Sequence, residues 1–138
     1  MTKVRLVAGI GVALAVALVA GWIWGTAERS TLARALQASE LRDELLGARA
    51  AVLDARVAIY AVNFGEASRH LEDARGLLGR ADTRLTGLGR TADVHQLATA
   101  RERVDAAQRM TGKLDQSANA RAGEAAQIMA EMLVVAPR

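Results

Sequence analysis

The apolar residues of this chain recur with alternating spacings of three and four from residue 28 to residue 132. This spacing places them on one face of an α-helix, which turns once in about 3.6 residues. We expect such lines to be the core faces of packed helices, so the predicted fold class is all-α. The lines are Ala38, Leu41, Leu45, Ala48, Val52, Ala55, Ile59, Val62; then Phe64, Ala67, Leu71, Ala74, Leu78, Ala81, Leu85, Leu88; then Leu97, Ala100, Val104, Ala107, Thr111, Leu114, Ala118, Ala122, Ala125, Met129, Met132, with one extra residue near the middle of the last.

The composition also favours helices over strands. Hydrophobic residues make up 51% of the chain, but aromatic residues only 3%, and the one proline is Pro137. Alanine and leucine have high helix propensities, whereas sheets draw on aromatic and β-branched residues. We therefore predict an antiparallel bundle of three helices, at about residues 27–62, 64–87 and 92–134.

The predicted boundary after Leu88 is marked by residues that end one helix and cap the next. Gly87 and Gly89 can take the left-handed conformation in which many helices end. Asp93 and Gln96 have the spacing of a capping box, in which each side chain bonds to the backbone of the other residue. One helix should end here and the next begin.

The boundary near residue 63 allows two interpretations. Asn63 and Glu66 have capping-box spacing, and Gly65 disfavours a helix interior, so these three residues are the candidate inter-helix turn. The alternative is one long helical hairpin with an unbroken rod to Leu88, because a second apolar line continues through this point without a change of phase. That line is Leu46, Ala50, Leu53, Val57, Tyr60, Phe64, Ala67, Leu71.

The segment from Asn63 to Ala67, followed by Leu71 and Ala74, resembles the turn and second helix of a tetratricopeptide-type hairpin. The resemblance covers about residues 50–80. It stops there because Ala51 and Ala55 stand where the family has a large residue and a glycine, and no second repeat follows. It implies a local helical hairpin, without the family's peptide-binding role.

An uncharged apolar segment precedes these helices at residues 6–24. As a helix it would be about 28 Å long, close to the thickness of a bilayer core. Trp22 and Trp24 stand at its end, where indole rings favour the lipid headgroups. We predict a transmembrane anchor within residues 1–26, which also include a short cytoplasmic stub.

The flanking charges predict the orientation of this anchor. Lys3 and Arg5 precede it without any acidic residue, so the positive-inside rule puts the N-terminus in the cytoplasm. Residues 27–136 would then form an exported bundle, periplasmic or extracellular. Cleavage near Ala27, as in a secretory signal, is the competing interpretation, but the apolar run exceeds the usual signal core of about 7–15 residues.

Small residues recur every four positions within the predicted anchor. Such a stripe lets a second transmembrane helix approach closely. We therefore treat it as a candidate transmembrane association face, although a segment so rich in glycine and alanine can produce the pattern by chance. The residues are Gly9, Ala13, Ala17, Gly21 and Gly25.

The basic character of the chain does not indicate nucleic-acid binding. Lys3 and Arg5 supply two of the 18 basic side chains, and the remaining 16 nearly balance the 15 acidic ones. Opposite charges alternate along the helices, whereas a phosphate-binding patch gathers one sign of charge. No nucleic-acid partner is expected.

The residue types that carry chemistry are few. There is no cysteine, and His70 and His95 are the only histidines. Glu66, His70 and Asp73 could share a helix face, but the Glu-x-x-His pairs of a di-iron bundle are missing. Ser68 and His70 are two apart and so do not face one another on a helix. We predict no catalytic site, cofactor, metal or small-molecule substrate, and no enzyme.

Taken together, these features suggest a membrane-anchored helical-bundle protein of the bacterial inner membrane. It would act as a structural or protein-interaction module through coiled-coil-like packing, with itself or with another envelope protein. The alternative is an exported sensory or ligand-binding bundle that signals through a partner, which predicts a polar pocket.

Overall fold

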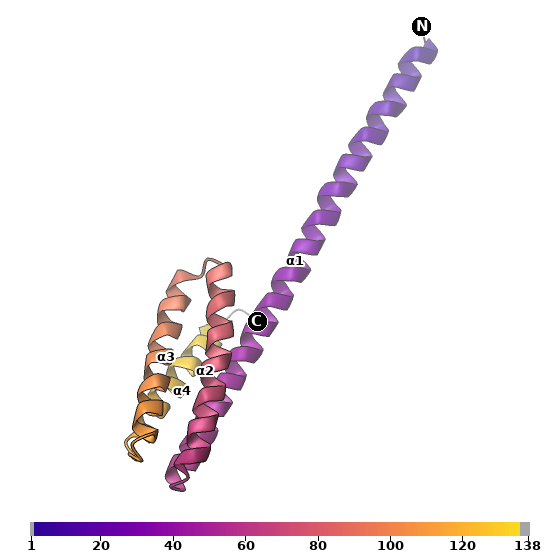
Figure 1. The fold of residues 1–138 in the computed structure, drawn as a ribbon. Helices are drawn as coiled ribbons and strands as arrows, with labels where there is room; N and C mark the ends of the chain where they lie inside the picture. The colour runs from indigo at the N-terminus through magenta and orange to yellow at the C-terminus, as the bar shows by residue number, and fades with distance from the viewer. Residues whose placement is uncertain (1, 136–138) are drawn as a thin grey trace. The chain divides into compact units, whose positions relative to one another are not determined.

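The computed structural model describes the backbone of residues 2–135 and the side chains of residues 31–135. These residues form four α-helices, α1 (Thr2–Tyr60), α2 (Phe64–Gly87), α3 (Thr91–Thr111) and α4 (Ala118–Val135), as Figure 1 shows. They contain no β-strand. The predicted all-α fold class is therefore confirmed. The chain divides into two units, Met1–Ala38 and Ser39–Arg138, and the second contains the bundle.

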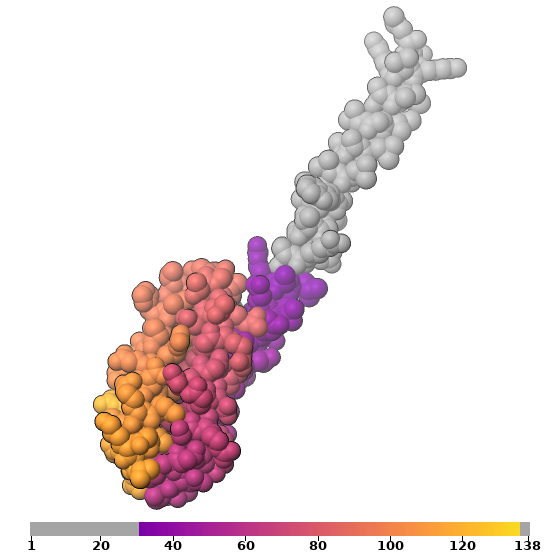
Figure 2. Space-filling view, viewed as in Figure 1, coloured from indigo at the N-terminus to yellow at the C-terminus, as the bar shows by residue number. Residues whose placement is uncertain are grey.

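Most residues of the predicted apolar lines form the core of the bundle, whereas Val62, Leu88 and Leu114 are exposed. Side chains from residues 39–60 of α1 and from α2, α3 and α4 meet in it, so the bundle has four helical segments. Nearly half of them are alanines, which allow close approach of the helix axes, and leucine fills much of the remaining space. In Figure 2 the side chains of α2 and α3 cover the face turned to the viewer. The core residues are Leu41, Leu45, Ala48, Val52, Ala55, Leu71, Ala74, Leu78, Ala81, Leu85, Leu97, Ala100, Val104, Ala107, Ala122, Ala125, Ala126, Met129 and Met132.

The chain turns between α1 and α2 at residues 61–63, so the unbroken rod to Leu88 is wrong. The N–H of Asn63 donates to the carbonyl of Ala58 (2.8 Å), and the N–H of Val62 to that of Ile59 (3.0 Å). This is the hydrogen-bond pattern of a Schellman motif, and Val62 takes its left-handed position with φ 59°. The other two turns repeat the pattern around Gly89 (φ 67°) and Leu114 (φ 58°).

The predicted helix 92–134 is wrong as a single element, because α3 ends at Thr111 and α4 begins at Ala118. The extra residue in the third apolar line falls in this turn. Thr111 and Ala118 are buried, whereas Leu114 points into solvent from the left-handed position. Hydrogen bonds from Ser117 lower the pKa of Asp115 in the same turn.

Ion pairs between neighbouring helices border the core. Arg84 of α2 bonds to Glu44 of α1 at 3.0 Å and also to Glu40, and the hydrogen bond to Glu44 raises the pKa of Arg84 above its usual range. Arg75 of α2 lies 2.7 Å from Asp105 of α3. Such pairs fix the rotation of each helix more than they stabilise the fold, because exposed ion pairs contribute little.

Candidate interaction surface

One face of α1 stays uncovered within the bundle. We call this the outward face, and it consists of Leu46, Ala50, Leu53, Val57 and Tyr60. Val57 is 69% exposed and Tyr60 85% exposed, Leu46 and Ala50 are exposed, and only Leu53 packs partly against the core. These residues belong to the second apolar line of the sequence, which stops at Tyr60 because α1 ends there.

The outward face lies opposite the buried face of the same helix. Leu45 is 2% exposed and its neighbour Leu46 is 43% exposed, because adjacent helix positions are about 100° apart. On one side of the outward face α1 meets α2, where Gly47 allows close approach of Leu77. On the other side α1 meets α4, where Arg56 Nε donates to Asn119 Oδ1 at 2.7 Å. The two neighbouring helices therefore border this face and leave it open.

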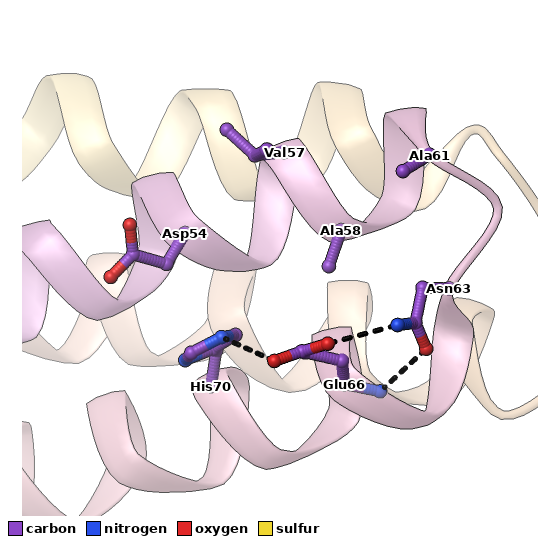
Figure 3. Close-up of a pocket in the computed structure, with 7 residues that line it drawn as sticks. All are labelled: Asp54, Val57, Ala58, Ala61, Asn63, Glu66 and His70. Carbon is purple, nitrogen blue, oxygen red and sulfur yellow. Dashed lines mark hydrogen bonds and ion pairs between the residues drawn. The ribbon is translucent and has the colours of Figure 1, made fainter.

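A groove of about 280 Å³ lies at the α1–α2 turn, beside the outward face. Figure 3 shows the residues that line it. Val57 belongs to both the face and the groove, so the two form one continuous surface. The end of α1 supplies the apolar part of the lining, and the start of α2 supplies most of the polar part. The lining residues are Asp54, Val57, Ala58, Ala61, Asn63, Glu66 and His70.

The candidate turn residues Asn63, Gly65 and Glu66 lie at the rim of this groove. Asn63 caps α2, since its Oδ1 accepts from the N–H of Glu66 (3.2 Å) and its Nδ2 donates to Glu66 Oε2 (2.9 Å). His70 Nε2 lies 3.8 Å from the other carboxylate oxygen of Glu66. Gly65 has open space where a side chain would be. The polar atoms of Asn63 and Glu66 are thus already bonded to each other.

A second groove of about 280 Å³ lies along the end of α4. Gln127, Ala130, Glu131, Val134 and Val135 line it, and all of them come from that one helix. Val134 and Val135 are exposed there, while the core residues Met129 and Met132 lie on the buried side of the helix. With a single helix as its wall, this surface is a shallow strip.

The candidate transmembrane association face belongs to the N-terminal part of α1. Gly9, Ala13, Ala17, Gly21 and Gly25 lie outside the residues whose side chains the structure describes, as does the whole predicted span at residues 6–24. Among residues 31–135, no helix has an apolar stretch long enough to cross a membrane.

Ser68 and Thr111 both form hydrogen bonds that support the fold. Ser68 Oγ accepts a hydrogen bond from Gln108 Nε2 at 2.7 Å, which joins α2 to α3. Thr111 is buried and donates to the carbonyl of Ala107 (2.8 Å). Within residues 31–135 no group of three His, Asp or Glu side chains has the arrangement of a metal site.

Sequence reasoning overlooked two charged residues beside the outward face, Arg49 and Asp54. Arg49 Nε is buried without a hydrogen-bond partner among the described residues. Asp54 is exposed at the edge of the groove, and none of the ion pairs within residues 31–135 includes it. The regular spacing of Arg42, Arg49 and Arg56, seven apart, could have drawn attention to this edge.

Comparison of the chain with protein-family models, curated proteins and solved structures gives no match. The function proposed for the chain therefore depends on its own residues.

Proposed function

We propose that this protein is a membrane-anchored interaction module of the bacterial envelope. Its N-terminal segment holds it in the inner membrane, and its helical bundle lies on the periplasmic or extracellular side. The outward face of α1 is the surface through which it associates with another protein chain. The observation that carries the proposal is that Leu46, Val57 and Tyr60 are all exposed on the same face of one helix.

An apolar helix face of this kind supports association over catalysis. Exposed apolar side chains scattered singly are normal, but a line of them on one helix face has the pattern of a coiled-coil contact. The chain also offers aromatic Tyr60, a residue type that is enriched in protein interfaces. Covering such a face with a partner helix would stabilise a complex by removing apolar surface from water.

The location is proposed from the sequence of residues 1–26. The uncharged run at residues 6–24 has the length of a bilayer span, and Lys3 and Arg5 precede it. A reporter enzyme that is active only outside the cytoplasm, fused after residue 138, tests the orientation. Activity in the full-length fusion, and its loss when residues 1–26 are deleted, is the expected result. Extraction of the full chain into the soluble fraction by alkaline carbonate would contradict the anchor.

Photo-cross-linking in living cells tests the association. A photoreactive amino acid at Val57 should capture a protein chain, whereas the same amino acid at exposed Thr83 of α2 is the matched control. Capture that is equal at both positions, or absent at Val57, would contradict the role of the outward face. Mass spectrometry of the cross-linked species then identifies the partner chain.

The sensory alternative predicts a polar pocket, and the groove at the α1–α2 turn matches it best. Its volume of about 280 Å³ is at the low end for small-molecule sites. Asn63 and Glu66 bond to each other across its rim, and Glu66 also faces His70. Because these groups already have partners, the groove offers Asp54 as its main free polar contact. We therefore prefer association to ligand binding.

A further inference from the structure

We propose that the partner on the outward face is a second copy of this chain, packed parallel and in register as a two-helix coiled coil. The inference rests on the proposed association through this face and names its occupant. It is carried by the positions of charged residues along the two edges of the face.

The outward face fits the heptad pattern of a coiled-coil seam. In heptad letters, Ala50 and Val57 occupy position a, and Leu46, Leu53 and Tyr60 occupy position d. These are the positions that interdigitate between two helices. Because Leu46, Ala50, Val57 and Tyr60 are exposed in the single chain, the seam is free to receive another helix.

The edge positions e and g carry opposite charges. Position g holds Arg42, Arg49 and Arg56, and position e holds Glu40 and Asp54. In a parallel pair the g residue of one helix meets the e residue of the next heptad in the other helix, so Arg49 meets Asp54 of the second copy. In an antiparallel pair g meets g, which would oppose arginine with arginine. The charges therefore favour the parallel arrangement.

Neither of the two residues that meet forms an ion pair with another residue of the described bundle. Glu40 already forms an ion pair with Arg84, and Arg56 already donates a hydrogen bond to Asn119. Arg49 has a buried Nε with no acceptor among the described residues, and Asp54 has no cationic partner there. A two-fold related copy brings Asp54 to Arg49 twice, once on each side of the seam. Association would then give both charged groups a partner of opposite sign at the edges of the seam.

Single cysteines provide the test, because the chain has none of its own. The full chain in mild detergent would carry Leu46→Cys, Val57→Cys or Tyr60→Cys and would be oxidised with copper phenanthroline. In a parallel in-register pair each position faces itself, so all three variants should form disulfide-linked dimers. The controls Thr83→Cys and Ala98→Cys, exposed on α2 and α3, should remain monomers on a non-reducing gel.

Dimers at only one of the three positions would overturn the parallel register, because antiparallel helices bring like positions together only where they cross. Dimers at none of them would overturn the second copy as occupant. Ala50→Cys replaces any variant that loses its helical spectrum. If the photoreactive amino acid placed at Val57 in living cells then captures a different protein, the proposed function stands and only this inference fails. If it captures nothing, both fail.

A charge exchange provides an independent test. Asp54→Arg should weaken dimerisation about tenfold by placing arginine against Arg49. The double variant Arg49→Asp with Asp54→Arg should recover most of that loss, since it exchanges the partners and keeps their opposite signs. Equal dimerisation by the wild type and by Asp54→Arg would contradict the paired edges.

Discussion

The two faces of α1 differ in burial although their sequence patterns are alike. Leu41, Leu45 and Val52 lie on the covered face, where α2 and α4 meet α1, and the side chains of Leu46, Val57 and Tyr60 lie on the outward face. Both faces follow the spacing of three and four that defines a helix stripe. An apolar stripe therefore says that a helix has a partner surface, and the rest of the fold decides whether that partner belongs to the same chain.

Substitution of two adjacent leucines should give the largest difference between the faces, measured as the free energy of unfolding. Leu45→Ala should lower the free energy of unfolding by about 2–5 kcal/mol, because it leaves a cavity in the core. Leu46→Ala should change it by less than about 1 kcal/mol in the monomer, since that side chain is partly solvated. Urea unfolding of the full chain at high dilution measures both. Equal losses would mean that the outward face is covered in the monomer.

A charge on the outward face should act on association alone. Val57→Lys should raise the dissociation constant of the dimer at least about tenfold, because a lysine would lose hydration at position a. The monomer should keep its unfolding free energy, as Val57 is exposed. Thr83→Lys on α2 is the matched control and should affect neither quantity. Size-exclusion chromatography over a dilution series gives the dissociation constant.

Val62 is exposed like the outward face but falls outside its heptad line. A substitution there should change the stability of the fold and not dimerisation. Its left-handed backbone (φ 59°) is sterically costly for a β-branched residue and carries no steric cost for glycine. Val62→Gly should therefore stabilise the fold by up to about 1 kcal/mol and leave dimerisation unchanged. Gly89→Ala, the reverse change at an equivalent turn, should destabilise it by a similar amount. Weaker dimerisation in Val62→Gly would extend the interface to the turn.

Salt should have the smallest effect of these changes, and it should act on the dissociation constant of the dimer. Raising the salt concentration from about 0.1 to 1 M screens the Arg49–Asp54 pairs at the edges and leaves the apolar seam intact. We expect the dimer to weaken only about two- to threefold, because exposed ion pairs contribute about 0–1 kcal/mol each. A loss of more than about a hundredfold would make charge, and not the apolar face, the source of association.

Much of the core could be predicted from the sequence because burial in a helix leaves a periodic trace. Leu71, Leu78 and Leu85 stand two turns apart in succession and all reach the core. The α1–α2 turn was visible as well, since Asn63 and Glu66 have the spacing of a cap. These features depend on neighbours within a few residues, which a single sequence displays directly.

The break between α3 and α4 could not be predicted in this way. Two of the three turns place Val62 and Leu114 in the left-handed position, where glycine or asparagine is usual. The apolar line through Leu114 also hides the turn, because the leucine fits the helical period even though it is exposed. Tertiary packing of Thr111 and Ala118 overrides this local preference.

Only part of the candidate interaction surface could be predicted from the sequence, for a related reason. The apolar line from Leu46 to Tyr60 could be read, but not its exposure, because that depends on where α2 and α4 lie. The pairings of Glu44 with Arg84 and of Arg56 with Asn119 join residues far apart in the chain. Only with these pairings known do Arg49 and Asp54 emerge as two charged residues beside the outward face that form no ion pair among the described residues.

Sedimentation equilibrium of the full chain in density-matched mild detergent tests the central claim most directly. If the outward face of α1 binds a second copy, the wild type should show a reversible monomer–dimer equilibrium, and Val57→Lys should sediment as a monomer over the same concentrations. A wild type that stays monomeric throughout, or a dimer that Val57→Lys leaves unchanged, would contradict it.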